Sequence, residues 1–258
     1  MSTFLILPAN ASHDMFPDNK NHNYKKHLPE RLKLEGGQWE LALRSITFNN
    51  NWYNVRNAFI DVTVTDAVGR DSVRRVNVKD GRYESIKKLW EDTHTAFETM
   101  FVEKIVQLFY DKDRNNMHLM FFRDGVRVKF SPDLAQIIGF DSETEYERPS
   151  EVHNYVRAKS VPDIEAGYET LYVYCSLCAN RFVGDALVPC LYNVPVTPHD
   201  SKSTVVHQSI QPPMYVPAVN TDTDEIEIDI RRGDGQPVLF RGGCVVVTVH
   251  LTKKKEQR

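Results

Sequence analysis

The most regular pattern in the chain is the alternation of isoleucine with acidic residues over residues 224–230. Ile226, Ile228 and Ile230 fall on one side of an extended strand, and the acidic residues between them fall on the other. This alternation is typical of a strand in an antiparallel sheet that has one buried and one solvated face.

Apolar and β-branched runs predict many further strands. A short run over residues 4–7 ends at Pro8, and residues 39–48 place apolar side chains on both faces, which favours a strand buried on both sides. The remaining predicted strands, several of them joined by Gly-containing turns, cover residues 58–65, 73–78, 104–110, 117–122, 126–130, 169–178, 181–194, 214–218, 238–241 and 244–251.

The period changes to three and four residues after Ser85. Ile86, Leu89, Trp90 and Phe97 form one apolar stripe, so this segment is expected to be the one long helix of the chain. A brief second helix is expected from Ser131 and Pro132 to a stop at Gly139, because a hydroxyl cap followed by proline favours a helix start.

Strands before and after a helix-bearing centre predict a mainly β protein, a β-sandwich whose core is shared by the two ends of the sequence. The length of 258 residues corresponds to about 1.7 typical domains. We therefore expect one domain over residues 1–258, with a helix-containing α+β insertion at 79–147. An exposed polar arm is expected at 9–26 and a tail at 252–258.

Composition and charge narrow the function. The formal net charge is only −3, which disfavours a dedicated nucleic-acid-binding role for the body of the protein, and the lysines of the arm and tail are expected to be solvated. The chain has no apolar run of about 18 residues and no basic segment before an apolar one at its start. We expect neither a membrane span nor a signal for secretion.

Two motifs could hold a metal or carry redox chemistry. Cys175 and Cys178 have the spacing of a redox or metal pair, but they end an apolar strand and lack a second pair of ligands, so a structural role is expected. Residues 220–224 resemble the first half of a calcium loop, yet Glu225 stands where the loop needs glycine and Arg231 where it needs glutamate. We predict no metal site and no cofactor.

Motifs for catalysis are also missing. The sequence has no nucleophile elbow, no metalloprotease motif and no phosphate-cradling glycine loop, and its nine histidines are scattered singly. No catalytic residue is therefore predicted. A hydrolase on a β-sandwich, with catalytic residues far apart in sequence, stays open as a third hypothesis.

Arg232, Gly233 and Asp234 form the integrin-binding tripeptide, placed where a loop between two strands should reach solvent. Asp234 and Gly235 are also a common hairpin turn, which explains most of the pattern without a receptor. These three residues are a candidate receptor-binding loop.

Several segments together resemble the minor capsid (penton) proteins of Polinton/Maverick elements and the related adintoviruses. The similar stretches are FLILPANAS followed by FPDN, GQWELALRSITFNNNWYNV, SPDLAQIIGF, LYVYC, VGDALVPCLYNV, MYVPA and EIEIDIRRGDGQPVLFRGGCVVVTVHL. The resemblance implies a single jelly roll without catalytic residues or cofactors. It also implies a homopentamer at the five-fold vertices of a virion capsid, docked to double-jelly-roll major capsid proteins.

A ring of five copies would cover surface that looks apolar in one subunit, so Trp52 and Tyr53 are candidate assembly contacts if they are exposed. The alternative function is a jelly-roll attachment module that binds a cell receptor or a glycan through a loop such as Arg232 to Asp234. A vertex protein could do both. The protein would be made in the cytoplasm or nucleus of a host cell.

Overall fold

A computed structural model describes residues 2–35, 38–149, 154–196, 205–219 and 222–254. The chain forms two compact units. The first joins Met1–Trp52 to Gly167–Arg258, and the second is Tyr53–Ala166.

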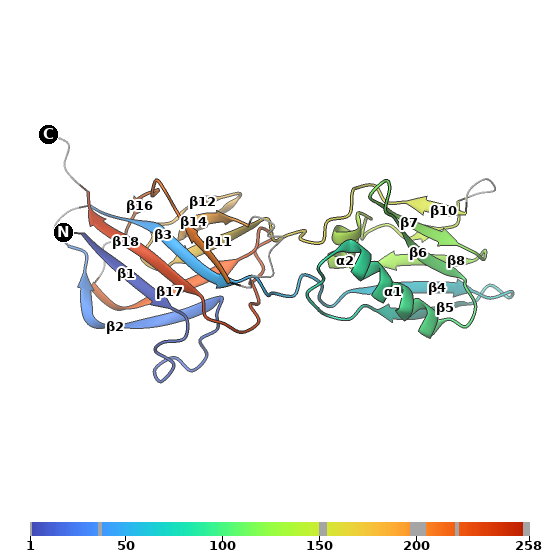
Figure 1. The fold of residues 1–258 in the computed structure, drawn as a ribbon, viewed down its shortest axis with the longest axis horizontal. Coiled ribbons are helices and arrows are strands. Elements are labelled where there is room, and N and C mark those ends of the chain that lie inside the picture. Colours follow the sequence, from blue (N-terminus) through green and yellow to red (C-terminus); the bar gives the residue numbers. More distant parts are fainter. Residues whose placement is uncertain (1, 36–37, 150–153, 197–204, 220–221, 255–258) are drawn as a thin grey trace. The chain divides into compact units, whose positions relative to one another are not determined.

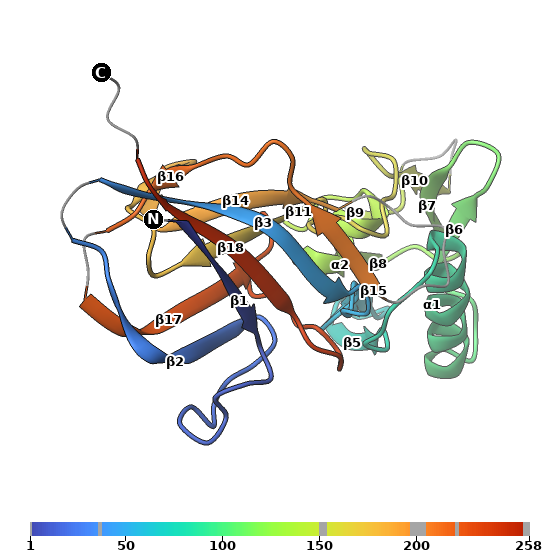
Figure 2. The same ribbon diagram turned by 60° about the vertical axis from the view of Figure 1, so that its left-hand side comes forward.

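The first unit is a sandwich of two antiparallel sheets (Figures 1 and 2). The first sheet has the order β1 (Ser2–Pro8), β18 (Val246–Lys253), β3 (Trp39–Asn49) and β15 (Val205–Ser209), and β16 (Val216–Pro217) also pairs with β3. The second sheet has the order β14 (Cys190–Pro195), β11 (Thr170–Cys175), β17 (Asp222–Arg231) and β2 (Asn23–Lys33). A separate hairpin consists of β12 (Arg181–Val183) and β13 (Ala186–Val188).

The inner faces of the two sheets share one hydrophobic core. It includes Leu41, Leu43, Val247 and Val249 from the first sheet and Val173, Leu191, Ile226, Ile228 and Ile230 from the second. Each fully buried side chain of this size contributes about 1.5–3 kcal/mol through apolar burial. The predicted alternation in β17 is confirmed, and the mainly β jelly-roll sandwich with a helix-containing insertion is the observed fold class.

The second unit has its own core and two small sheets. One sheet has the order β5 (Asp71–Asn77), β4 (Phe59–Thr65), β8 (Val126–Phe130) and β9 (Tyr146–Glu147). The other has the order β10 (Tyr155–Arg157), β7 (Asn116–Phe121) and β6 (Val106–Asp111). The helices α1 (Ile86–Met100) and α2 (Pro132–Ile138) also belong to this unit, and the apolar stripe of α1 contributes Leu89 and Phe97 to its core.

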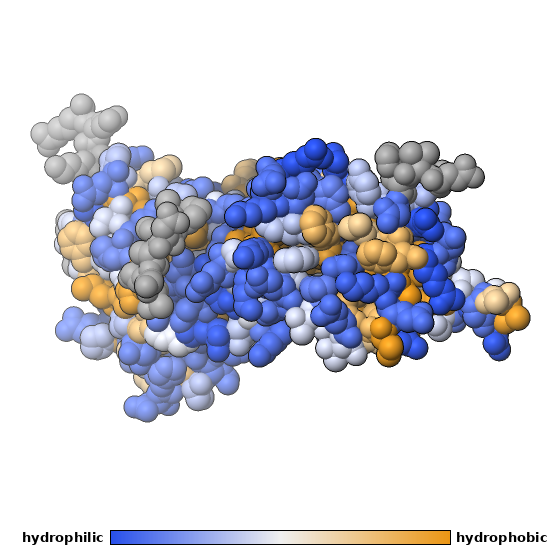
Figure 3. Space-filling view, turned by 45° about the vertical axis from the view of Figure 1, so that its right-hand side comes forward, coloured by the Kyte–Doolittle hydropathy of each residue, from blue (hydrophilic) through white to orange (hydrophobic). Residues whose placement is uncertain are grey.

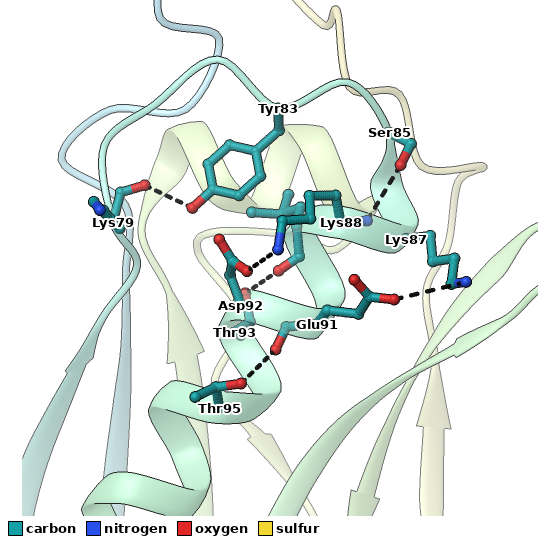
Figure 4. A network of polar contacts seen from close by, with 10 residues as sticks. Lys79, Tyr83, Ser85, Lys87, Lys88, Glu91, Asp92, Thr93 and Thr95 are labelled. Carbon is teal, nitrogen blue, oxygen red and sulfur yellow. Dashed lines mark hydrogen bonds and ion pairs between the residues drawn. The ribbon is translucent and has the colours of Figure 1, made fainter.

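Local features explain where α1 begins and where α2 ends. Ser85 caps α1 by accepting a hydrogen bond from the Lys88 amide at 3.2 Å, and Lys88 pairs with Asp92 at 2.7 Å one turn later (Figure 4). The helix α2 starts at Pro132 and stops at Gly139, whose φ of +79° favours glycine. A Cβ at Gly139 would also collide with the Ser160 carbonyl. Both helices are confirmed, but the predicted hydroxyl cap of α2 is wrong, because Ser131 makes no side-chain capping bond and its hydroxyl instead accepts from the Phe59 amide at 3.1 Å.

The inserted unit extends beyond the predicted range of 79–147. The strands β4 and β5 were expected in the sandwich, but β4 pairs with β8 and therefore belongs to the second unit. The segment up to Ala166 belongs there as well. The jelly roll is thus confined to the first unit.

The predicted arm at 9–26 is only partly an exposed loop. Ala9 is buried, β2 begins at Asn23, and the buried Tyr24 donates a hydrogen bond to the Leu7 carbonyl at 2.8 Å. Although most residues of β2 are polar, the first part of the strand alternates between buried and exposed side chains. At the other end β18 continues to Lys253, and residues 255–258 of the predicted tail lie outside the described residues.

Candidate assembly surfaces

The tripeptide Arg232, Gly233 and Asp234 lies in a closed turn after β17. The Arg232 amide donates to the Gln236 carbonyl at 2.8 Å, and the Gln236 amide donates to the Asp234 carboxylate at 2.9 Å. Gly235 has a φ of +80°. The hairpin-turn interpretation therefore accounts for the backbone here.

The side chains of this turn bind one another. The Arg232 Nε lies 3.2 Å from Asp234 Oδ1, and a second guanidinium nitrogen contacts the other carboxylate oxygen. The Arg232 side chain is only 15% exposed and its guanidinium lies over the Tyr168 ring, 4.9 Å from the centroid. A receptor could engage both charges only after this ion pair had opened.

Tyr168 connects this turn to Trp52. The two rings are stacked with centroids 5.1 Å apart and planes 5° from parallel, and both are buried. The structure thus brings Trp52 and Arg232, which the sequence singled out for unrelated reasons, into contact with the same tyrosine ring. Nothing near Tyr168 in the sequence indicated this role.

The two candidate assembly contacts, Trp52 and Tyr53, differ in burial and belong to different units. The prediction for Trp52 is wrong, because its side chain is fully buried in the core of the jelly roll and contacts Phe48, Tyr168 and Phe240. Tyr53 is partly exposed and belongs to the second unit. Its role in assembly stays a prediction.

The cysteines are part of the core. Cys175, Cys178 and Cys190 are buried and unbridged, and Cys178 donates its amide to the Cys175 carbonyl at 2.9 Å in a tight turn. The neighbouring Cys175 and burial raise the pKa of the Cys178 thiol, so its reactive thiolate is disfavoured. In the described part of the chain, no cluster of three or more His, Cys, Asp or Glu could hold a metal ion.

Two further features are the calcium-loop pattern and a surface hollow beside β17. Asn220 and Thr221 lie outside the described residues, while Asp222 and Asp224 lie in β17 beside Arg31, 3.9 and 3.7 Å from its guanidinium. A hollow of about 250 Å³ next to β17 is lined by Ser176, whose hydroxyl accepts the Glu227 amide. No described helix is long and apolar enough to cross a membrane.

The outer face of the first jelly-roll sheet carries an exposed aromatic row. Phe4 of β1 pairs in register with His250 of β18, and His250 with Ala42 of β3. The Phe4 and His250 rings are stacked with their centroids 4.6 Å apart, and the Tyr215 hydroxyl forms a hydrogen bond with His250 Nδ1 at 2.6 Å. We call Phe4, Ile6, Tyr215 and His250 the Phe4 face.

The outer face of the second sheet is instead charged. Glu227 pairs in register with Lys25, Glu225 pairs with His27, and Arg231 contacts Asp229 at 2.7 Å. This is the ordinary composition of a solvated sheet face.

A second apolar projection is the β12–β13 hairpin. Phe182 and Leu187 are a cross-strand pair, and they are 81% and 56% exposed. The hairpin starts beside β16, because the Ala179 amide donates to the Pro217 carbonyl at 2.9 Å.

On the second unit, hydrophobic residues gather on the face seen in Figure 3, and several large apolar side chains of this unit are exposed. They are Val68, Val73, Val102, Phe109, Phe122 and Val161.

No family model matches the chain, and no curated protein matches it. Its fold is similar to that of a solved structure, the mavirus penton protein, with a TM-score of 0.50, 10% sequence identity and coverage of 98% of this chain and 100% of that one. A chain of the Sputnik virophage structure also matches, with a TM-score of 0.48, 9% identity and coverage of 98% of both chains.

Proposed function

We propose that the protein is a minor capsid subunit that forms pentamers at the five-fold vertices of an icosahedral virion. The observation that carries the proposal is the likeness in fold to the mavirus penton protein, which covers 98% of this chain and therefore includes both units. The protein would be a component of the virion capsid and would dock to double-jelly-roll major capsid proteins.

The surface of the jelly roll is consistent with assembly. A net charge of −3 leaves little long-range repulsion between copies. The Phe4 face and the β12–β13 hairpin expose apolar groups that a lone subunit in water does not need. Both features support a protein that works by contact with other capsid subunits.

The direct test is the mass of the purified chain in solution, measured by light scattering over a range of concentrations. The expected mass is about 149 kDa, five times the subunit mass of 29.8 kDa. A chain that stays monomeric at high concentration, both alone and with a double-jelly-roll major capsid protein, would contradict the proposal.

Docking is tested by co-expression with the major capsid protein and electron microscopy of the particles. Five-fold vertices should be filled when the chain is present and open when it is omitted. Filled vertices without the chain would show that another protein has this role.

A further inference from the structure

The strand β1 is an unusual edge strand. Edge strands in natural proteins are commonly protected by charged residues, because their open backbone edge can pair with another chain. The outward positions of β1 and of its neighbour β18 hold no Lys, Arg, Asp or Glu: they are Ser2, Phe4, Ile6, Pro8, Val246, Thr248, His250 and Thr252. Phe4 and Ile6 are 58% and 67% exposed.

The aromatic groups on this face are held in place. The His250 ring lies between Ser2 Oγ at 2.5 Å and the Tyr215 hydroxyl at 2.6 Å, and it stacks on Phe4. Ala42, which pairs with His250 in register, is fully buried. A face whose side chains are already ordered loses little entropy when a partner binds.

The β12–β13 hairpin offers a matching projection at the other edge of the same unit. The first sheet begins with β1, whereas β16, which contacts the start of the hairpin, lies on the side of β3 opposite β18. Besides its apolar pair, Phe182 and Leu187, the hairpin carries an exposed Asp185 at its tip. Exposed Lys253 and Lys254 stand at the end of β18 beside the Phe4 face.

We propose that the β12–β13 hairpin of one copy seats Phe182 and Leu187 on the Phe4 face of the next copy. Asp185 then lies towards the lysines at the end of β18. This inference rests on the proposed assembly into a ring and names the contact that closes it. A closed ring needs two different patches on each subunit. Phe4 and Ile6 lie on β1 at one edge of the first sheet, and the hairpin starts beside β16 at the other edge.

Other parts of the chain fit this face less well. The outer face of the second sheet bears Glu225, Glu227 and Asp229, and burying these carboxylates against apolar rings would cost solvation that the rings do not replace. A nucleic acid would find no cation at the outward positions of β1 and β18 up to Thr252. An apolar hairpin with one acid at its tip suits both the rings and the flanking lysines.

The test uses site-directed cross-linking of the full chain in a Cys244→Ser background, because Cys244 is the one partly exposed cysteine among the described residues. Ile6→Cys and Leu187→Cys are prepared separately, mixed in equal amounts and treated with a short bis-maleimide. The expected product is a covalent dimer that forms in the mixture and not with either variant alone. The matched control is Ile6→Cys mixed with Val68→Cys, which places the thiol on an exposed valine of the second unit.

Cross-linking of Ile6→Cys to itself would mean that two Phe4 faces pair symmetrically, which overturns the inference. Rings that form without the mixed product overturn it too, and they leave the proposed function standing. A chain that never assembles would contradict both the proposed pentamer and the proposed contact.

A charge variant gives a second readout. Ile6→Lys should weaken subunit association by about tenfold or more, whereas Val68→Lys should leave the mass unchanged. Circular dichroism checks that both variants are folded. Intact rings of folded Ile6→Lys would contradict the proposed contact.

Discussion

The two sheets of the jelly roll have equivalent inner faces and opposite outer faces. Inside, both contribute fully buried aliphatic residues to one core. Outside, the second sheet alternates acids with a lysine and a histidine across β17 and β2, while β1 and β18 present aromatic and small polar groups. Packing constrains the inner faces alike, so the difference between β17 with β2 and β1 with β18 reflects what each outer surface meets.

The largest effect on stability is expected when a buried side chain is removed from the inner face of either sheet. Ile228→Ala in the second sheet and Leu251→Ala in the first each remove a fully buried side chain. Each should lower the free energy of unfolding by about 2–5 kcal/mol, through lost burial and the cavity left behind. Urea denaturation measures both. A cost below about 1 kcal/mol at either position would show that its sheet is not part of the shared core.

The inner faces could be predicted from the sequence, and the outer faces could not. Ile226, Ile228 and Ile230 alternate with acids, so the buried side of β17 is visible locally. Residues 4–7 are all apolar, so only the pairing of β1 with β18 decides that Phe4 and Ile6 point outward. Register between strands some 240 positions apart leaves no local signal.

The same limit explains the other differences from expectation. The strand β4 looks like any sandwich strand until its pairing with β8 places it in the second unit. Trp52 was a candidate contact, but Tyr168 and Phe240, both distant in sequence, enclose it. The turn at Asp234 and Gly235 was predicted correctly because turn chemistry is local.

A charge introduced on the outer face of each sheet should affect subunit association differently. Thr248→Lys adds a cation to β18 directly beside Ile6 of β1, and Glu227→Lys reverses a charge on the other sheet. Thr248→Lys should weaken subunit association by about tenfold, equivalent to 1.4 kcal/mol, while Glu227→Lys should not change it. Sedimentation of both variants measures the effect, and equal weakening would mean that the two faces do not differ in assembly.

The hydrogen bond within the Phe4 face predicts a smaller effect. Tyr215→Phe keeps the ring and removes the hydroxyl that lies 2.6 Å from His250 Nδ1. The expected loss of stability is about 0.5–1.5 kcal/mol, because the hydrogen bond is lost while its packing stays. Thermal unfolding measures it, with Tyr172→Phe on the outward side of the second sheet as the matched control. An equal loss in the control would assign the effect to the loss of any tyrosine hydroxyl.

A cross-strand pair on the charged face should matter less. Lys25→Gln removes one partner of the Glu227 pair on a solvated surface, so it should cost roughly 0.2–1 kcal/mol. High salt should reduce the difference between the variant and the parent chain, since salt screens exposed pairs. A larger cost that persists in high salt would show that this face is less solvated than its composition indicates.

The smallest effect is expected at the integrin-type tripeptide. Asp234→Glu disrupts recognition in a functional integrin-binding motif, but here the Asp234 carboxylate already binds Arg232 and the Gln236 amide. Cell attachment by the assembled protein should therefore be the same for Asp234→Glu and the parent chain. Loss of attachment in this variant, with its mass and thermal stability unchanged, would mean that the ion pair opens for a receptor. The Phe4 face and the β12–β13 hairpin would then not be the only parts of the jelly roll whose exposed groups serve a partner.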